Sequence, residues 1–244
     1  MKKTKQLALT FAILATSFAQ AQWSSKGKIT GNGNVITQQK TTANYDGIAV
    51  TGFFDVVLVE GKEGNITIKG EENLLEYINI SVDNNQLKIA SEKNKYISPS
   101  KGKEIIITVP FESISKVAMT GSGDVTTKNP IEAKSFQVQL TGSGDMNLDV
   151  RATNIDVTLT GSGDINLSGS TAEITTVLSG SGDIDTSKLK AQTADATVSG
   201  SGDTTVYCIE MIRARVSGSG DIQYKGDPKK KDTKVNGSGS ISKA

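Results

Sequence analysis

The chain has 244 residues, with 27 lysines and arginines, 26 aspartates and glutamates, no histidine, one cysteine and 5% aromatic residues. The lack of histidine excludes Ser-His-Asp triads, Cys-His pairs and histidine metal sites, and a single cysteine excludes an internal disulfide and a CxxC site. The near balance of charge argues against a nucleic-acid-binding protein, because that class carries a strong excess of basic residues.

Residues 1–21 have the pattern of a secretory signal peptide. Three lysines precede the apolar run of residues 7–15, and Ala19-Gln20-Ala21 supplies the small residues that precede a cleavage site. The apolar run is shorter than the roughly 20 residues that span a bilayer. We therefore expect cleavage after Ala21, no transmembrane segment after cleavage, and an exported protein that is periplasmic, cell-surface or secreted.

The segment that follows is expected to lead into a single domain. Residues 22–45 are rich in Gly, Asn, Thr and Gln and predict a loosely ordered lead-in, and residues 46–244 predict one domain. Within residues 46–120, short alternating segments separated by charged turns predict strands, and residues 71–77 predict a short helical turn. Because Gly52-Phe53-Phe54-Asp55 lies between two such strands, we interpret 46–120 as irregular coils of the repeat that follows.

Residues 121–244 contain a tandem repeat. The tetrapeptide Gly-Ser-Gly-Asp begins at Gly121, Gly142, Gly161, Gly180, Gly200 and Gly218. A seventh copy begins at Gly237 and has Ser240 in place of the aspartate, and successive copies are 18 to 21 residues apart. Alternating apolar and polar residues on both sides, as in residues 155–159 and 165–167, predict half-buried strands. Gly-x-Gly between them predicts a tight turn, because glycine adopts positive φ without steric cost.

This pattern predicts an all-β fold, a right-handed single-stranded β-helix (β-solenoid) of about 19–20 residues per coil. One strand–corner–strand unit cannot bury its apolar face alone, whereas stacked units bury a continuous core. A β-propeller is disfavoured because its blades repeat every ~40–50 residues. The atypical first coils and the last copy without aspartate are expected to act as terminal caps.

The recurring aspartates allow two interpretations. A ladder of carboxylates can bind Ca²⁺, as in other glycine-rich repeats that contain aspartate. Alternatively, each carboxylate accepts hydrogen bonds from N–H groups of its own turn while the serines stack into a hydroxyl ladder. We favour the structural role, because each coil offers one carboxylate and a 6–8-coordinate ion needs more oxygens. The residues concerned are Asp124, Asp145, Asp164, Asp183, Asp203 and Asp221.

Three other features were considered as sites. The basic stretch of residues 225–234 is expected to be a solvated loop before the last coil, with contact to acidic polysaccharide or lipid headgroups as the functional alternative. Arg213 and Arg215 alternate with Ala214 and so are expected to point the same way, which would suit a carboxylate ligand. Cys208 is expected to be a buried small hydrophobic residue rather than a reactive thiol.

The signal peptide, the opening from Tyr45 to Val59 and the serial Gly-Ser-Gly-Asp coils resemble the auto-transporter adhesins of the head-GIN domain family, common in Bacteroidetes. The resemblance covers about residues 45–240. It implies an exported β-helical domain with an adhesive role, and it supplies no catalytic motif.

We therefore expect a protein that is not an enzyme and that presents a repetitive polar surface to cell-envelope or extracellular glycans or proteins. Homo-oligomer contacts are a further expectation, and no cofactor is expected apart from the Ca²⁺ alternative. Two rival functions stay open. One is a polysaccharide-active β-helix hydrolase or lyase, which would need unlike acidic residues on adjacent coils; the other is a structural envelope protein that assembles end to end.

Overall fold

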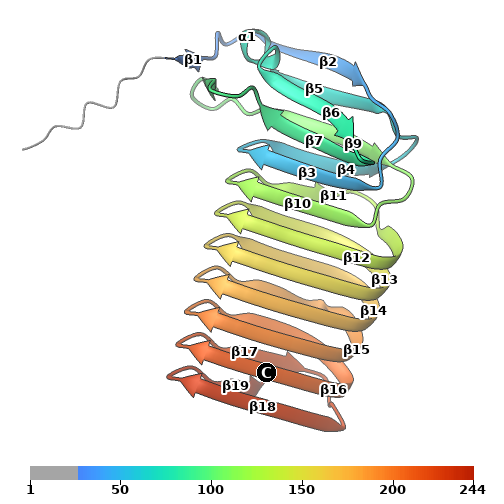
Figure 1. Cartoon of the computed structure of the whole chain (residues 1–244), viewed down its shortest axis with the longest axis vertical. Helices are drawn as coiled ribbons and strands as arrows, with labels where there is room; N and C mark the ends of the chain where they lie inside the picture. Colours follow the sequence, from blue (N-terminus) through green and yellow to red (C-terminus); the bar gives the residue numbers. More distant parts are fainter. Residues whose placement is uncertain (1–26) are drawn as a thin grey trace, which may run out of the picture.

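The structure is a computed structural model that describes residues 27–244, so the predicted signal peptide lies outside the described residues. These residues form a tall, narrow molecule made almost entirely of strands (Figure 1). The elements are β1 (Lys28–Thr30), β2 (Val35–Thr41), β3 (Gly47–Gly52), β4 (Asp55–Glu60), β5 (Asn65–Glu71), α1 (Glu72–Leu75), β6 (Ile78–Asp83), β7 (Gln86–Ser91), β8 (Tyr96–Ser98), β9 (Ile106–Phe111), β10 (Lys116–Gly121), β11 (Val125–Thr127), β12 (Ile131–Gly142), β13 (Asp145–Gly161), β14 (Asp164–Gly180), β15 (Ile184–Gly200), β16 (Thr204–Gly218), β17 (Ile222–Lys225), β18 (Lys230–Gly237) and β19 (Ile241–Lys243).

Strands β10–β19 wind into a β-solenoid of about seven turns in which every ladder is parallel. The corner glycines pair in series, Gly142 with Gly161 and Gly161 with Gly180, so the predicted stacking of the bends is confirmed. We call the strand segments before each corner the pre-corner face and those after it the post-corner face. The right-handed sense of winding stays a prediction.

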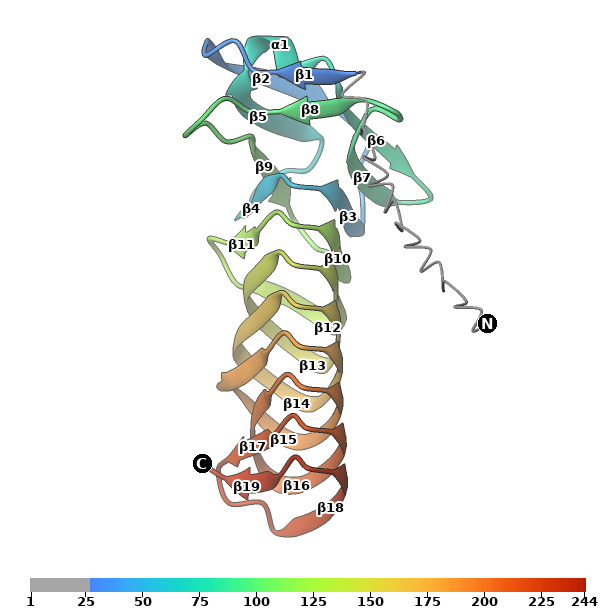
Figure 2. The same ribbon diagram turned by 90° about the vertical axis from the view of Figure 1, so that its left-hand side faces the viewer.

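Opposite the corners, the chain bends within continuous strands rather than in separate turns. The strands β12–β16 fold back on themselves in Figure 2 while pairing along their length. Residues 149–152 of β13 pair with residues 168–171 of β14 across the bend, so the polar residues 168–171 are part of a ladder. This works because successive coils bend at the same level and their N–H and C=O groups stay in register.

The core is a set of apolar columns that run down the inside of the solenoid. On the pre-corner face, Met119, Leu140, Leu159 and Leu178 stand in register on successive strands and are fully buried. Alternate residues face inward because side chains of a strand project to opposite faces with a period of two. The apolar–polar alternation of the sequence is therefore the alternation between core and surface.

At the corners, the backbones of consecutive coils approach more closely than a side chain allows. The first glycine of each motif has positive φ, for example +132° at Gly161. The second glycine is required for a different reason: a Cβ at Gly163 would lie 2.0 Å from the carbonyl oxygen of Gly144 in the coil before. The sequence pattern explained the first glycine through its φ, and the structure adds the close approach that requires the second.

The top coil, β3 and β4, is separated from the next coil by 69 residues of sequence but joins it directly. Gly52 pairs with Gly121, which confirms that Gly52-Phe53-Phe54-Asp55 is a corner of the same series. Phe54 stands where the later corners have their second glycine and is fully buried. On its other side, β3 pairs with β7, and this pairing stops at Thr51. No corner therefore lies above Phe54, and its side chain has room.

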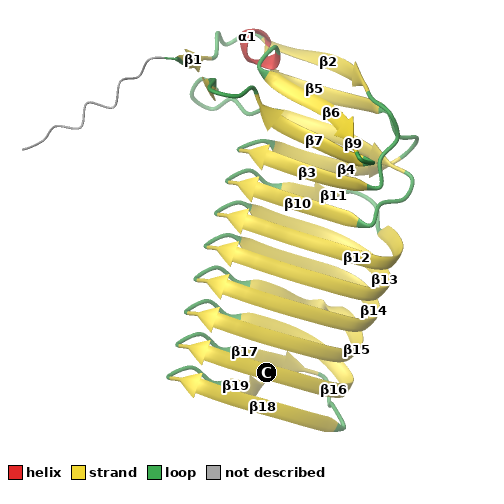
Figure 3. Ribbon diagram, in the orientation of Figure 1, coloured by secondary structure: helices red, strands yellow, loops and turns green. Residues whose placement is uncertain are grey.

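Residues 28–41 and 61–115 form a cap over this top coil rather than further coils. The cap pairs β7 and β9 with the free edges of β3 and β4, and contains the antiparallel pairs β2–β5, β5–β9 and β6–β7. Helix α1, within the predicted helical turn, lies at the same end of the molecule (Figure 3). In place of the loose order expected before residue 46, residues 28–41 contribute β1 and β2 to the cap.

A buried carboxylate holds the loops of the cap together. Glu71 is 1% exposed and accepts hydrogen bonds from the Ser100 backbone N–H (2.8 Å), the Ser100 hydroxyl (2.7 Å) and the Gly33 N–H. The Ser100 hydroxyl bond, with the two backbone N–H groups, lowers the pKa of Glu71. A carboxylate with a lowered pKa stabilises the fold at neutral pH and loses that contribution as pH falls through its folded pKa.

The opposite end, which we call the base and which consists of residues 225–244, is closed by charge instead of by a cap. In β18 and β19, Lys231 and Lys243 occupy the inward columns that hold Ile212 and Tyr224 one coil above. The Lys231 ammonium lies 5.1 Å from the centroid of the Tyr224 ring. Inward charges and edge lysines are a recognised means of preventing sheets from joining edge to edge. The stretch 225–234, expected to be a solvated loop, thus consists largely of the last coil.

Filling the close approach at a corner should destabilise the solenoid. Gly163→Ala is expected to lower the free energy of unfolding by about 2–3 kcal/mol, because the two coils must separate to admit the new methyl group. Urea unfolding measures the change. Ser162→Ala, at the exposed neighbour in the same corner, is the matched control and should stay within about 0.5 kcal/mol of the wild type. Equal effects of the two substitutions would contradict the steric explanation.

Replacing the inward charges of the base should create a joining surface. The variant Lys231→Ile, Thr233→Val, Lys243→Leu extends the apolar columns to solvent and is expected to associate through its base at lower concentration than the wild type. Light scattering across a concentration series measures the mass. The same number of apolar substitutions at the outward positions Lys230, Lys234 and Asn236 should promote association less. A triple variant that stays monomeric at every concentration would show that these charges do not protect the base.

Candidate functional site

The repeated aspartates form a ladder of hydrogen bonds from coil to coil. The Asp164 N–H donates to Oδ1 of Asp145 (3.1 Å), and the Asp183 N–H donates to Oδ1 of Asp164 (3.0 Å). The same bond links Asp124 to Asp145, Asp183 to Asp203, and Asp203 to Asp221. The carboxylates were expected to accept N–H groups of their own turn; instead each accepts from the next coil, because the stacked corner brings that N–H within reach.

The serines of the corner contribute backbone rather than side-chain bonds. The Ser162 N–H donates to the carbonyl oxygen of Gly142 (2.9 Å), and the Gly163 N–H donates to the same oxygen (3.2 Å). The expected hydroxyl ladder is absent from the hydrogen bonds of residues 27–244. Ser240, the replacement for aspartate in the seventh copy, donates to Oδ1 of Asp221 through its N–H (2.7 Å) and its hydroxyl (3.0 Å). The backbone bonds of the corner thus continue the hydrogen bonding between coils from one strand face to the other.

The six aspartates stand in a single column, and each coil contributes one carboxylate to it. Over residues 27–244, the structure brings together no group of three or more Asp, Glu or Cys side chains that could surround one metal ion. The related Asp55 of the top coil is in a different environment, because burial raises its pKa and the N–H of Asp124 only partly opposes this. The Ca²⁺ interpretation of the ladder stays a prediction, and the structure shows the carboxylates engaged as hydrogen-bond acceptors.

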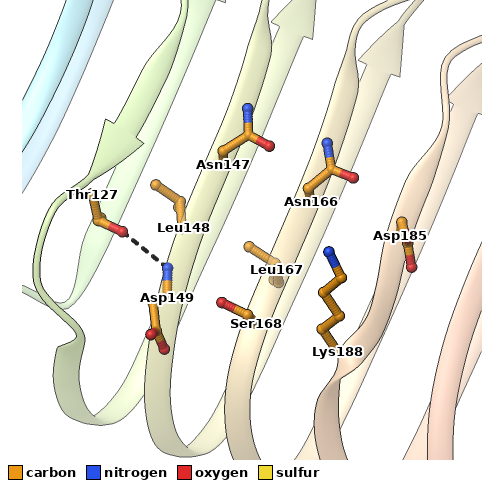
Figure 4. Close-up of a pocket in the computed structure, with 9 residues that line it drawn as sticks. All are labelled: Thr127, Asn147, Leu148, Asp149, Asn166, Leu167, Ser168, Asp185 and Lys188. Atoms are coloured by element: carbon orange, nitrogen blue, oxygen red, sulfur yellow. Dashed lines mark hydrogen bonds between the residues drawn. The ribbon is translucent and has the colours of Figure 1, made fainter.

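The post-corner face carries a depression that sequence reasoning did not identify. It has a volume of about 390 Å³ and is lined by residues of four successive coils (Figure 4). Two polar columns cross it in register: Asn147, Asn166 and Asp185 form one, and Asp149, Ser168 and Lys188 form the other. The residues that line it are Thr127, Asn147, Leu148, Asp149, Asn166, Leu167, Ser168, Asp185 and Lys188. In the sequence, the polar residues that alternate with apolar ones in 145–149 and 164–168 indicate which side chains face outward. Alternation alone does not distinguish a hollow surface from a flat one.

Asp149 is the most unusual member of this site. Its backbone N–H donates to the Thr127 hydroxyl (3.0 Å), as drawn in Figure 4, whereas its side-chain Oδ1 is buried and has no hydrogen-bond partner within the described structure. A buried polar atom without a partner costs free energy. Asp149 thus has one carboxylate oxygen in a buried, unpaired environment, unlike the corner aspartates, whose Oδ1 atoms accept an N–H.

A β-bulge in β15 sets the lower margin of the depression. The register passes from Asn166–Asp185 to Ser168–Lys188, so β15 has one residue more than β14 at this point. The Ser187 N–H donates to Oδ1 of Asp185 (2.8 Å) and holds the bulge. The extra residue accounts for the 20-residue interval between Gly180 and Gly200, and the exposed Lys188 follows it directly. Bulges commonly re-aim a side chain next to a functional site.

The two arginines near the base do point the same way, as expected, but they are engaged within the sheet. Arg215 contacts Oδ2 of Asp232 at 2.7 Å. Arg213 contacts Oδ2 of Asp195 at 2.9 Å and that of Asp232 at 3.7 Å. The Arg215 hydrogen bond lowers the pKa of Asp232. The carboxylates that these arginines could bind are thus supplied by the protein's own neighbouring coils, Asp195 before them and Asp232 after them.

Cys208 is fully buried, as expected for a small hydrophobic residue. Burial raises the pKa of its thiol to about 11, so the thiolate that would act as a nucleophile or metal ligand is disfavoured at neutral pH. No helix among residues 27–244 has the length and apolar character required to cross a membrane.

Removing one rung of the aspartate ladder should weaken the stacking locally. Asp164→Ala deletes the acceptor of the Asp183 N–H and is expected to lower the free energy of unfolding by about 1 kcal/mol, since water replaces part of the bond at this exposed corner. Asp164→Asn retains an oxygen at Oδ1 and should recover most of the loss. Urea unfolding measures both variants. A wild-type midpoint that rises with CaCl₂, together with an Asp164→Ala midpoint that does not, would instead favour the Ca²⁺ interpretation.

Comparison with solved structures places the whole fold in a known group. The chain is similar to a putative adhesin from Bacteroides fragilis, with 25% identity, a TM-score of 0.81, and coverage of 88% of this chain and 100% of that chain. It is also similar to two proteins from Parabacteroides distasonis. One is a putative lipid binding protein, with 24% identity, a TM-score of 0.72, and coverage of 89% of this chain and 99% of that chain. The other is a putative adhesin, with 21% identity, a TM-score of 0.72, and coverage of 89% and 100%. A search of curated proteins gave no match.

The family model described as "Putative auto-transporter adhesin, head GIN domain" matches residues 44–228, which include the top coil, the cap strands β5–β9 and most of the stacked coils. The resemblance inferred from the Gly-Ser-Gly-Asp series is thereby confirmed, and the chain belongs to this family.

Proposed function

We propose that this protein is an exported binding protein of adhesin type that holds a cell-envelope or extracellular glycan in the depression of its post-corner face. The observation that carries the proposal is the depression itself, which two columns of polar side chains cross in register. Sugars present closely spaced hydroxyl groups that both donate and accept hydrogen bonds.

The composition of the depression suits a neutral or amide-bearing sugar. Asn147 and Asn166 each offer a carbonyl acceptor and an NH₂ donor, and Lys188 and Ser168 add further donors. Consecutive coils place polar groups every ~4.8 Å, so a chain of sugars along the axis would meet hydrogen-bonding side chains at each level. Several weak contacts on one rigid support can give a high overall avidity. The proposal therefore concerns a polymer rather than a single sugar.

Export rests on family membership and on the sequence pattern of residues 1–21. The expectation of a binding protein rather than an enzyme rests on the repeated aspartates, which share one environment as members of a hydrogen-bonded ladder. General acid–base catalysis instead needs two carboxylates whose environments differ.

One observation favours the polysaccharide-active enzyme as a second candidate. Asp149 and Asp185 lie in the same depression two coils apart, which is roughly 10 Å along the axis at ~4.8 Å per coil. Their surroundings differ: Oδ1 of Asp149 is unpaired, and Oδ1 of Asp185 accepts the Ser187 N–H. Chromatography of a bound polysaccharide after incubation separates the candidates, because an enzyme shortens the chain and a binding protein returns it intact.

The glycan proposal predicts that the asparagine column is required. On a glycan array, the wild type should bind at least one class of envelope or extracellular glycan, and Asn147→Ala with Asn166→Ala should weaken this binding at least tenfold through the loss of several hydrogen bonds. The control Gln137→Ala with Gln139→Ala removes two exposed amides from the pre-corner face and should bind as the wild type does. The array is run with and without chelator, since dependence on Ca²⁺ would assign a role to the aspartate ladder. No signal on any glycan would overturn the proposal.

A further inference from the structure

The charges of the protein are segregated along its long axis. Residues 205–244 contain eight lysines and arginines and four aspartates and glutamates, for a net charge of +4. Residues 27–204 contain fifteen basic and twenty-two acidic residues, for a net charge of −7. The base is therefore positive, and the cap and middle coils above it are negative. A molecule with this distribution orients in an electric field or near a charged surface.

The lysines of the base surround its end instead of lining one face. Lys230 and Lys234 belong to β18 on the pre-corner side, Lys225 ends β17 on the post-corner side, and Lys229 lies in the turn that joins them. Lys243 of β19 completes the ring, and all five side chains are exposed. Figure 2 shows β18 and β19 together at the end of the solenoid farthest from the cap.

Not all of these charges are neutralised within the protein. Lys229 pairs with Glu210 at 2.8 Å and Lys243 pairs with Asp227 at 3.0 Å. Lys225, Lys230 and Lys234 belong to no ion pair among residues 27–244. Three positive charges on different sides of the base are thus free to meet an external anion.

We infer that the base docks on a planar anionic surface formed by phospholipid headgroups, with the solenoid standing upright on it. A plane that covers the end of the solenoid meets lysines from every side of the ring, whereas a linear polyanion on one face would meet only those of that face. The negative coils above are repelled by the same surface, so an upright orientation is favoured over one in which the solenoid lies flat. Oriented in this way, the protein holds the depression of the post-corner face and the cap away from the lipid.

The inference is tested by co-sedimentation of the processed chain, residues 22–244, with vesicles of phosphatidylglycerol and phosphatidylcholine, and with vesicles of phosphatidylcholine alone. Binding to the anionic vesicles is expected, with loss at 0.5 M salt, where the Debye length falls to about 4 Å. Lys225→Gln, Lys230→Gln and Lys234→Gln together should weaken it about a hundredfold, since each lysine near an anionic surface contributes about fivefold.

The matched control is Lys128→Gln, Lys134→Gln and Lys190→Gln, which removes three exposed lysines from the middle coils and changes the net charge equally. It should bind as the wild type does, and the lysines and apolar run of residues 1–21, which could bind vesicles by themselves, are absent from every variant. Equal weakening by both triple variants would overturn the inference, because binding would then follow net charge alone. The inference would also be overturned if the protein bound soluble polygalacturonate through Lys225, Lys230 and Lys234 but did not bind the vesicles.

Discussion

The close contact between the backbones of consecutive coils at the glycine corner determines the rest of this structure. Where Gly163 lies against Gly144, there is no room for a Cβ. Because the glycines let the two backbones approach this closely, N–H groups of one coil reach the carbonyl and carboxylate oxygens of the coil before. Each coil is thereby fixed against the previous one at the same level. The inward columns of leucine, isoleucine and valine then stand in register, and the outward polar residues form columns on the surface. Stability and surface chemistry follow from the same contact.

Most of the architecture was accessible from sequence, because its cause is local and is repeated. The spacing of Gly-Ser-Gly-Asp and the alternation on either side of it predict strands, corners and their stacking. The cap was less accessible, since it depends on which strand edges β7 and β9 happen to cover, and such long-range pairing leaves no periodic pattern. The short segment 28–41 was misjudged for the same reason: its polar residues form strands only because β5 and β8 supply partners.

The candidate site was predicted less completely than the fold. The aspartates of the corner were identified, but the donor was assigned to the wrong coil, because the distance between coils at the bend cannot be derived from composition. The depression was missed. It depends on a single bulged residue, Ser187, and on the unpaired Oδ1 of Asp149, and both are properties of packing rather than of residue type. Arg213 is paired because Asp195 and Asp232 stand in its column on either side, and Arg215, two positions along the strand, reaches the same Asp232.

The two ends of the solenoid differ in a way that bears on how such a protein changes in length during evolution. Phe54 ends the series of corners at the top, and charged residues end it at the base, while every coil between them presents the same contact above and below. Duplication or deletion of a unit of about 19 residues in the middle would therefore preserve both ends. Each such event would move the top by one strand spacing, ~4.8 Å. The length of such a solenoid can in this way change without a new interface at either end.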